Sequence, residues 1–293
     1  MGITQTKILT VNSIVMLLSN VALNYCLIFG KGGFPAAGIA GAAIASSVSE
    51  AVSLLFFIIY TSMTADKRKY GFRRAFTLRP HLLKGMLSIS GWTMVQSFIS
   101  VSIWFIFFLA IEHLGERPLA VTNIVRNISA LLIMVISAFA TTAGALISNQ
   151  IGAGEQRCLF KTCGMTLKLT YAILIPLLII LCLFPESVLR AFTDSPSLIA
   201  ASVNSVYVMA SSTLIMAPSF ILFNAVSGTG NTRAGFIMEM ISLAVYTAVI
   251  YYGIIRLKPD VALCWFSEHV YGVTLIFLAW WYLKSGKWRG KKV

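Results

Sequence analysis

The chain has 293 residues, of which 58% are hydrophobic and only 11% are charged, and its net charge is +13. Soluble globular domains usually contain about 45–50% apolar and about 25% charged residues, so this composition excludes a soluble protein. It predicts an all-α, polytopic membrane protein whose main partner is the lipid bilayer. The basic excess would also suit a nucleic-acid-binding protein. We expect no nucleic acid, because basic residues in loops between spans set topology instead.

Eight apolar runs are long enough to cross a bilayer, which takes about 20 residues. In chain order they cover 8–29, 39–63, 85–111, 119–148, 165–185, 198–226, 235–255 and 261–283. The longest polar stretch, 66–84, separates the second run from the third. We therefore predict two spans and a linker in residues 1–83, and six spans in residues 84–293.

Basic residues are distributed unevenly between the two sides that these spans define. The side with the 66–84 segment and both chain ends holds 17 of the 23 Lys and Arg residues, and the other side holds 6. Loops rich in Lys and Arg lie in the cytoplasm. The pattern predicts that both termini are cytoplasmic, which requires an even number of spans, as eight is.

The second apolar run begins with closely spaced small residues, GIAGAAIASS at 38–47, and carries a carboxylate, Glu50, near its middle. Small residues let helix backbones approach closely inside a membrane. An acid within a span is costly and is by default a functional hypothesis. This stretch therefore predicts a tightly packed helix with a buried acid.

Two more carboxylates, Glu239 and Glu268, lie in the seventh and eighth runs. At about 1.5 Å of rise per residue, Glu50 lies about 16 Å and Glu268 about 10 Å into their spans, and Glu239 about 6 Å from the cytoplasmic end. We expect Glu50 and Glu268 either to bind a cation, a proton or a substrate, or to hydrogen-bond a neighbouring helix. Glu239 is interpreted as an interfacial acid paired with Arg233, with a binding role as the alternative.

Neutral and basic polar residues also enter the spans. Asn123, Arg126 and Asn127 begin the fourth span, and Gln96 lies inside the third. Asn123 and Asn127 share one helix face because they are four residues apart. We expect this face to line a cavity, with Arg126 reaching to the outer interface as the alternative. Gln96 is a candidate hydrogen-bonding partner for a substrate.

The third span is rich in aromatic residues, which can stack on a flat organic cation. They include Trp92, Trp104, Phe105, Phe107 and Phe108, and we expect most of these to face lipid or to pack. The sequence has no Walker motif, no CxxC pair and no Ser/His/Asp set, so we expect no enzyme activity, no metal site and no cofactor.

Three segments and the spacing of the spans resemble the multidrug and toxic compound extrusion (MATE) family. NYCLIFGKGGFPAAGIAGAAIA at 24–45 resembles the passage from the family's fifth helix to its sixth. NQIGAGE at 149–155 and SGTGNT at 227–232 resemble the loops after its eighth and tenth helices. The order of the spans matches helices five to twelve.

The resemblance implies two lobes of six helices, related by a pseudo-two-fold axis. Residues 1–83 would be a two-helix remnant of the N-lobe, and residues 84–293 a complete C-lobe. Helices one to four, with the cation-binding acid of the first helix, have no counterpart. We therefore expect a missing N-terminal segment and a chain that is incomplete alone. The implied function is export of small organic cations or drugs across the inner (plasma) membrane in exchange for Na⁺ or H⁺.

An offset of 218 residues places Ser49 and Glu50 on Ser267 and Glu268, as parallel internal repeats would. The two acids would then occupy equivalent places in the two lobes. The alternative function is a lipid-linked saccharide flippase of related architecture. A flippase should line its cavity with many basic residues for pyrophosphate, whereas Arg126 is the only clear one inside a span, which favours cationic substrates.

Overall fold

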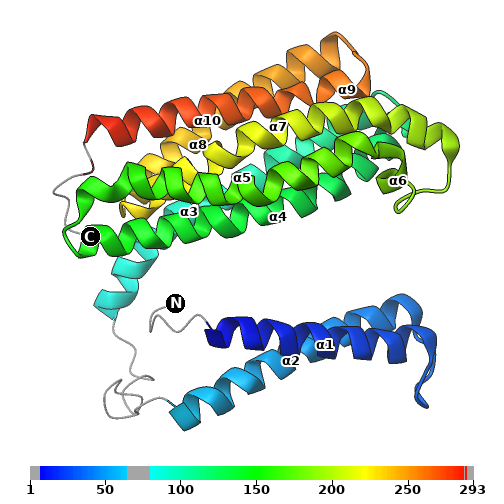
Figure 1. The fold of residues 1–293 in the computed structure, drawn as a ribbon, viewed down its shortest axis with the longest axis horizontal. Helices are drawn as coiled ribbons and strands as arrows, with labels where there is room; N and C mark the ends of the chain where they lie inside the picture. The colour runs from blue at the N-terminus through cyan, green and yellow to red at the C-terminus, as the bar shows by residue number, and fades with distance from the viewer. Residues whose placement is uncertain (1–6, 65–79, 287, 289–293) are drawn as a thin grey trace. The chain divides into compact units, whose positions relative to one another are not determined.

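The computed structural model describes residues 7–64, 80–286 and 288. These residues contain no strand, and eight of their helical segments are long and apolar enough to cross a membrane, as predicted (Figure 1). The chain divides into two compact units, Met1–Pro80 and His81–Val293. Most of the basic segment 66–84 lies outside the described residues, so the charge-based topology stays a prediction.

The helices are α1 (Lys7–Phe29), α2 (Gly38–Thr64), α3 (Pro80–Glu112), α4 (Glu116–Gly152), α5 (Leu159–Leu183), α6 (Pro185–Leu189), α7 (Pro196–Gly228), α8 (Thr232–Val249), α9 (Val261–Cys264) and α10 (Phe266–Ser285). A 3₁₀ turn, Gln156–Cys158, precedes α5, and a π-helical segment, Ile250–Arg256, extends α8.

The first unit is a hairpin of α1 and α2, and small residues bring the two helices together. Gly41, Ala45 and Ser49 are buried on α2, and their spacing of four residues puts them on one face. A Cβ atom at Gly41 would lie 2.5 Å from the carbonyl oxygen of Leu27 on α1, so only glycine fits there. The predicted close packing of the small-residue segment is confirmed.

The second unit is built around α4 and α7, whose backbones touch. A Cβ atom at Gly228 on α7 would lie 2.5 Å from the carbonyl oxygen of Gly144 on α4. A Cβ atom at Gly144 would in turn lie 2.9 Å from the carbonyl oxygen of Asn224. Because hydrocarbon offers no hydrophobic drive between helices, close backbone approach of this kind supplies packing energy through dispersion contacts.

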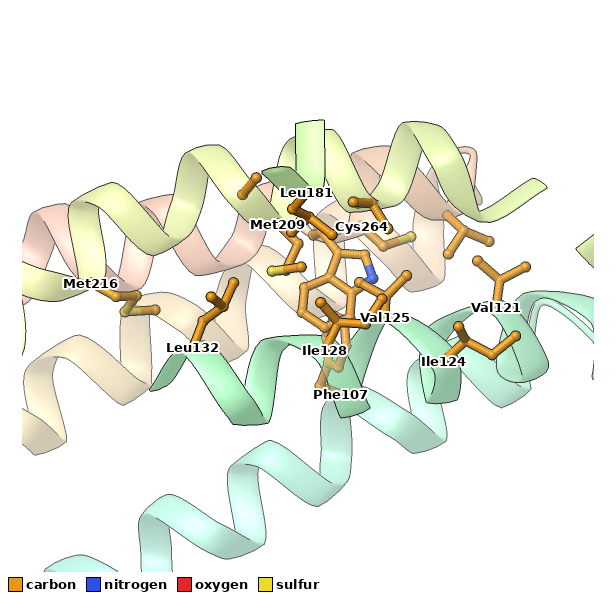
Figure 2. Packing of buried hydrophobic residues seen from close by; sticks show 14 of the residues in the cluster. Phe107, Val121, Ile124, Val125, Ile128, Leu132, Leu181, Met209, Met216 and Cys264 are labelled. Atoms are coloured by element: carbon orange, nitrogen blue, oxygen red, sulfur yellow. The ribbon is translucent and has the colours of Figure 1, made fainter. Parts of the chain in front are cut away.

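Apolar side chains from α3, α4, α5, α7 and α9 meet in a cluster of buried residues (Figure 2). Phe107, Val125 and Met209 are each at most 1% exposed. Dense packing of this kind fixes side chains in single rotamers, so the cluster holds these helices at defined distances. The polar site described below lies next to this rigid cluster.

The two glycine-rich segments end helices and start the next ones. After α4, Gly154 adopts the left-handed conformation with φ 83°, which favours glycine. After α7, Asn231 caps α8, because its side-chain oxygen accepts a hydrogen bond from the backbone N–H of Ala234 at 3.2 Å. The amide nitrogen of Asn231 also donates to the Tyr282 hydroxyl at 2.6 Å, which ties the cap to α10.

Candidate functional site

Glu239 on α8 is a deeply buried carboxylate, only 4% exposed. Its Oε1 accepts hydrogen bonds from the hydroxyls of Ser100 on α3 and Tyr271 on α10, both at 2.9 Å. Within the described part of the chain, its Oε2 has no hydrogen-bond partner. No Lys or Arg among the described residues pairs with it, so an ionised Glu239 lacks the counter-charge that buried ions need.

The expected pairing of Glu239 with Arg233 is wrong. The guanidinium of Arg233 is exposed and lies 5.9 Å from the ring centre of Trp92 instead. The reason is helical geometry: six residues of α-helix turn the side chain by about 240°, so Glu239 points to the interior when Arg233 points outward. Glu239 is therefore an internal acid and not an interfacial one.

Glu268 on α10 is half-buried, and its Oε1 accepts a hydrogen bond from the Tyr246 hydroxyl at 2.8 Å. Tyr246 belongs to α8 and its ring centre lies 5.8 Å from that of Tyr271. The two acids are thus joined through a pair of adjacent tyrosines. His269, the next residue of α10, lies within hydrogen-bonding distance of Ser211 on α7, with Nε2 and Oγ 2.9 Å apart.

Two cavities meet at Glu268. The smaller has a volume of about 250 Å³ and is lined by Ser100, Glu239, Tyr246 and Tyr271, together with apolar residues. The larger has a volume of about 550 Å³ and is lined by residues of α3, α4 and α10 and by Trp265. Trp104 and Glu268 border both, so the two cavities share one wall.

Arg126 and Asn127 on α4 line the larger cavity, as expected for this face of the fourth span. The guanidinium of Arg126 lies 5.1 Å from the ring centre of Phe108 and 5.9 Å from that of Trp104. These contacts are cation–π interactions, which hold the charge against aromatic faces of α3. Arg126 therefore faces the cavity.

The other candidates lie away from the two cavities. Gln96 is half-buried on α3, one turn before Ser100, and Asn123 is half-buried on α4; neither lines either of these two cavities. Glu50 is exposed within the α1–α2 hairpin, so the hairpin itself does not bury this acid. Ser49 and Ser267 are both buried, at 1% and 2% exposure, whereas Glu50 is exposed and Glu268 is half-buried. The equivalence of the two acids stays a prediction.

Four residues of this site carry no strong signal in the sequence: Ser100, Tyr246, Trp265 and Tyr271. Serine and tyrosine are common in membrane spans, and a hydroxyl becomes informative only when a buried acid lies opposite it. Tyr271 carries a partial signal in the sequence, because it follows Glu268 by three residues and therefore lies beside this acid on the helix surface. The partners of Glu239 come from α3 and α10, which local spacing cannot reveal.

Comparison with known proteins places this architecture in a family. The MatE family model matches residues 93–252, more than half of the chain. The probable multidrug resistance protein NorM of Thermotoga maritima is 25% identical over 291 residues, which is 94% of this chain and 59% of that protein. This chain thus spans about three fifths of the length of that relative.

Solved structures show the same fold. The outward-facing structure of a multidrug resistance MATE family transporter of the MOP superfamily matches with a TM-score of 0.81 at 16% identity, over 94% of this chain and 61% of that one. The MATE transporter ClbM in complex with Rb⁺ matches with a TM-score of 0.74 at 19% identity, over 94% and 61%. This multi-pass membrane protein belongs to the MatE family, a family of transporters.

Proposed function

We propose that the chain acts in secondary active transport of the multidrug efflux type, exporting organic cations or drugs across the plasma membrane in exchange for Na⁺ or H⁺. The observation that carries this proposal is Glu239, a buried carboxylate whose Oε2 is unpartnered at the wall of a cavity. Glu239 carries no net charge when it is protonated, and the pair that it forms with a monovalent cation carries none either. Both states therefore suit a site inside a membrane. Alternation between these states is the chemistry of cation exchange.

The surroundings of Glu239 suit an organic cation. Trp104, Phe220 and Tyr271 line the smaller cavity, and aromatic faces attract cations through their quadrupoles. Glu268 extends the negative wall into the larger cavity. Ligand pockets commonly combine an apolar lining with a few polar groups that fix orientation, as these two cavities do.

The relatives support the same class of function. The Thermotoga maritima protein is named a probable multidrug resistance protein, and ClbM was solved with a monovalent cation, Rb⁺. Glu50 remains a second candidate cation site, with Gln96 and Asn123 as candidate polar contacts. A flippase for lipid-linked saccharides has less support, because Arg126 is the one basic residue among those lining the two cavities.

Calorimetric titration with tetraphenylphosphonium tests the proposal. This cation cannot lose its charge, so its binding reports directly on a negative site. The full chain in detergent should bind it, and Glu239→Gln should weaken binding roughly tenfold or more, as loss of one charge-assisted contact does. Glu155→Gln, at an exposed acid outside both cavities, is the matched control and should leave the affinity unchanged. Absence of binding, or full affinity in Glu239→Gln, would contradict the proposal.

A further inference from the structure

We propose that the larger cavity binds a zwitterionic aromatic substrate, with the anionic group on Arg126 and Trp265 and the cationic group on Glu268. This inference rests on the proposed transport function and deepens it, because it adds an anionic group to the substrate. Three features of the cavity carry it, and they come from three separate elements of the fold.

The first feature is the guanidinium of Arg126, which has no carboxylate partner among the described residues. Arg126 lies ten residues after Glu116, the first residue of α4, and so about 15 Å along the helix. Its contacts within the described structure are the rings of Trp104 and Phe108, which leave its N–H groups without acceptors. Intramembrane charges pair with an opposite charge or face an aqueous cavity. A planar guanidinium on a cavity wall matches a carboxylate, which it can bind through two parallel hydrogen bonds.

The second feature is the indole N–H of Trp265, at the break between α9 and α10. Trp265 lines the larger cavity and is only 4% exposed, yet its Nε1 has no hydrogen-bond partner among the residues that the structure describes. Buried indole N–H groups normally find an acceptor. The ring is packed against Phe107, with ring centres 5.7 Å apart, so its position is fixed. A rigid unpartnered donor in the cavity wall points to an acceptor on the ligand.

The third feature is that opposite charges line one cavity without neutralising each other. Arg126 and Glu268 both border it, and the described structure contains no ion pair between them. Glu268 accepts one hydrogen bond, from Tyr246, and keeps the capacity to bind a cation. Trp104, Ile133 and Met134 supply apolar and aromatic lining. A ligand with an acid, a cationic group and a flat ring satisfies all three features at once.

Two fluorescent dyes provide a matched test. Rhodamine 110 carries a cationic xanthene and a free carboxylate, and rhodamine 123 is its methyl ester, so the pair differs at the anionic group alone. Fluorescence polarisation with the full chain in detergent, corrected for protein-free micelles, gives both affinities near neutral pH. Rhodamine 110 should bind roughly tenfold more tightly or better, the gain expected from a charge-assisted contact.

Variants assign the preference to its residues. Arg126→Gln should bring the two affinities to within about twofold, because rhodamine 110 loses its ion pair while rhodamine 123, whose cation is no longer repelled, binds at least as tightly as before. Trp265→Phe keeps an aromatic ring but removes the donor, and it should reduce the preference in part. Glu268→Gln should weaken both dyes. Arg157→Gln, an exposed arginine outside the two cavities, is the control and should retain the wild-type ratio.

Each outcome decides between the two proposals. Equal affinities in the wild type overturn the zwitterion assignment and leave cation transport standing. A preference that survives both Arg126→Gln and Trp265→Phe overturns the assignment to these residues. Binding of neither dye overturns this inference and the proposed function together. If Arg126→Gln does not fold, the wild-type ratio and Trp265→Phe still decide.

Discussion

Tyr271 on α10 donates its hydroxyl hydrogen to Glu239 on α8, with the two oxygens 2.9 Å apart. The reverse arrangement occurs alongside, where Tyr246 of α8 donates to Glu268 of α10 at 2.8 Å. Each helix therefore contributes one acid and one tyrosine to a reciprocal pair of hydrogen bonds. Both acids and both tyrosines line the smaller cavity, so α8 and α10 are bonded to each other at its wall.

Removing the Tyr271 hydroxyl should destabilise the protein. In Tyr271→Phe, Oε1 of Glu239 keeps only the bond from Ser100, and loss of a hydrogen bond to a buried charged or polar group costs about 1–3 kcal/mol. Thermal unfolding in detergent should show a lower midpoint. Tyr207→Phe is the control, because that exposed hydroxyl makes only a long bond of 3.5 Å to Cys182, and its midpoint should be unchanged. Equal midpoints for Tyr271→Phe and the wild type would contradict a structural role for this bond.

The α4–α7 crossing should tolerate no side chain at Gly228. Gly228→Ala places a Cβ atom 2.5 Å from the Gly144 carbonyl oxygen, so the helices must separate, at a cost of about 1–3 kcal/mol. Gly164→Ala, on the open surface of α5, meets no atom within 4 Å and should be neutral or more stable by up to about 1 kcal/mol. Unfolding by sodium dodecyl sulphate measures both. A stability loss of equal size in the two variants would argue against a specific close crossing.

Asn231→Ala should weaken the start of α8. It removes both the cap on the Ala234 N–H and the bond to Tyr282, and loss of an N-cap alone costs about 1 kcal/mol. Tyr282→Phe removes only the second bond and should cost less. Hydrogen exchange of the first turn of α8 distinguishes them: faster exchange is expected in Asn231→Ala and not in Tyr282→Phe.

Competition for Glu239 should reveal the coupling ion. A carboxylate that holds a proton or Na⁺ cannot also pair with the organic cation, so the coupling ion should weaken tetraphenylphosphonium binding. Lowering the pH from about 8 to about 6 tests H⁺, and replacing choline chloride with sodium chloride tests Na⁺. Glu239→Gln should abolish whichever dependence the wild type shows. Persistence of the dependence in this variant would place the coupling site elsewhere, with Glu268 and Glu50 as the remaining candidates.

Cysteine labelling should confirm the orientation. Single cysteines in a cysteine-free background, one at position 73 and one at position 117, should react with an impermeant maleimide from opposite sides of the membrane. The basis is the 17 to 6 division of Lys and Arg, which places the loop containing Arg73 in the cytoplasm. Reaction of both positions from the same side would refute the topology of eight spans.

The sequence by itself determined the class, the spans and the close packing of the small-residue segment of the second span. Apolar runs of spanning length identify the class and the spans, because the bilayer interior requires backbone polar groups to be satisfied internally and a helix does this within one segment. Small-residue segments indicate close packing for a reason that is also local, because short side chains let a neighbouring helix backbone approach. The glycine-rich loops likewise identified the family, since left-handed turns and caps are set by a few adjacent residues.

Only the tertiary structure decided the site. Glu239 looks interfacial when α8 is considered alone, and it becomes internal because Ser100 and Tyr271 approach it from α3 and α10. The packing of α8 against the apolar cluster of Figure 2 places Tyr246 against Glu268. Trp265 reaches the larger cavity because it lies at the break between α9 and α10, which no local sequence pattern predicts. Residue spacing determines which face of a helix a side chain occupies. The residues that this face contacts depend on how separate helices pack, and that packing is decided by many weak contacts between residues far apart in the sequence.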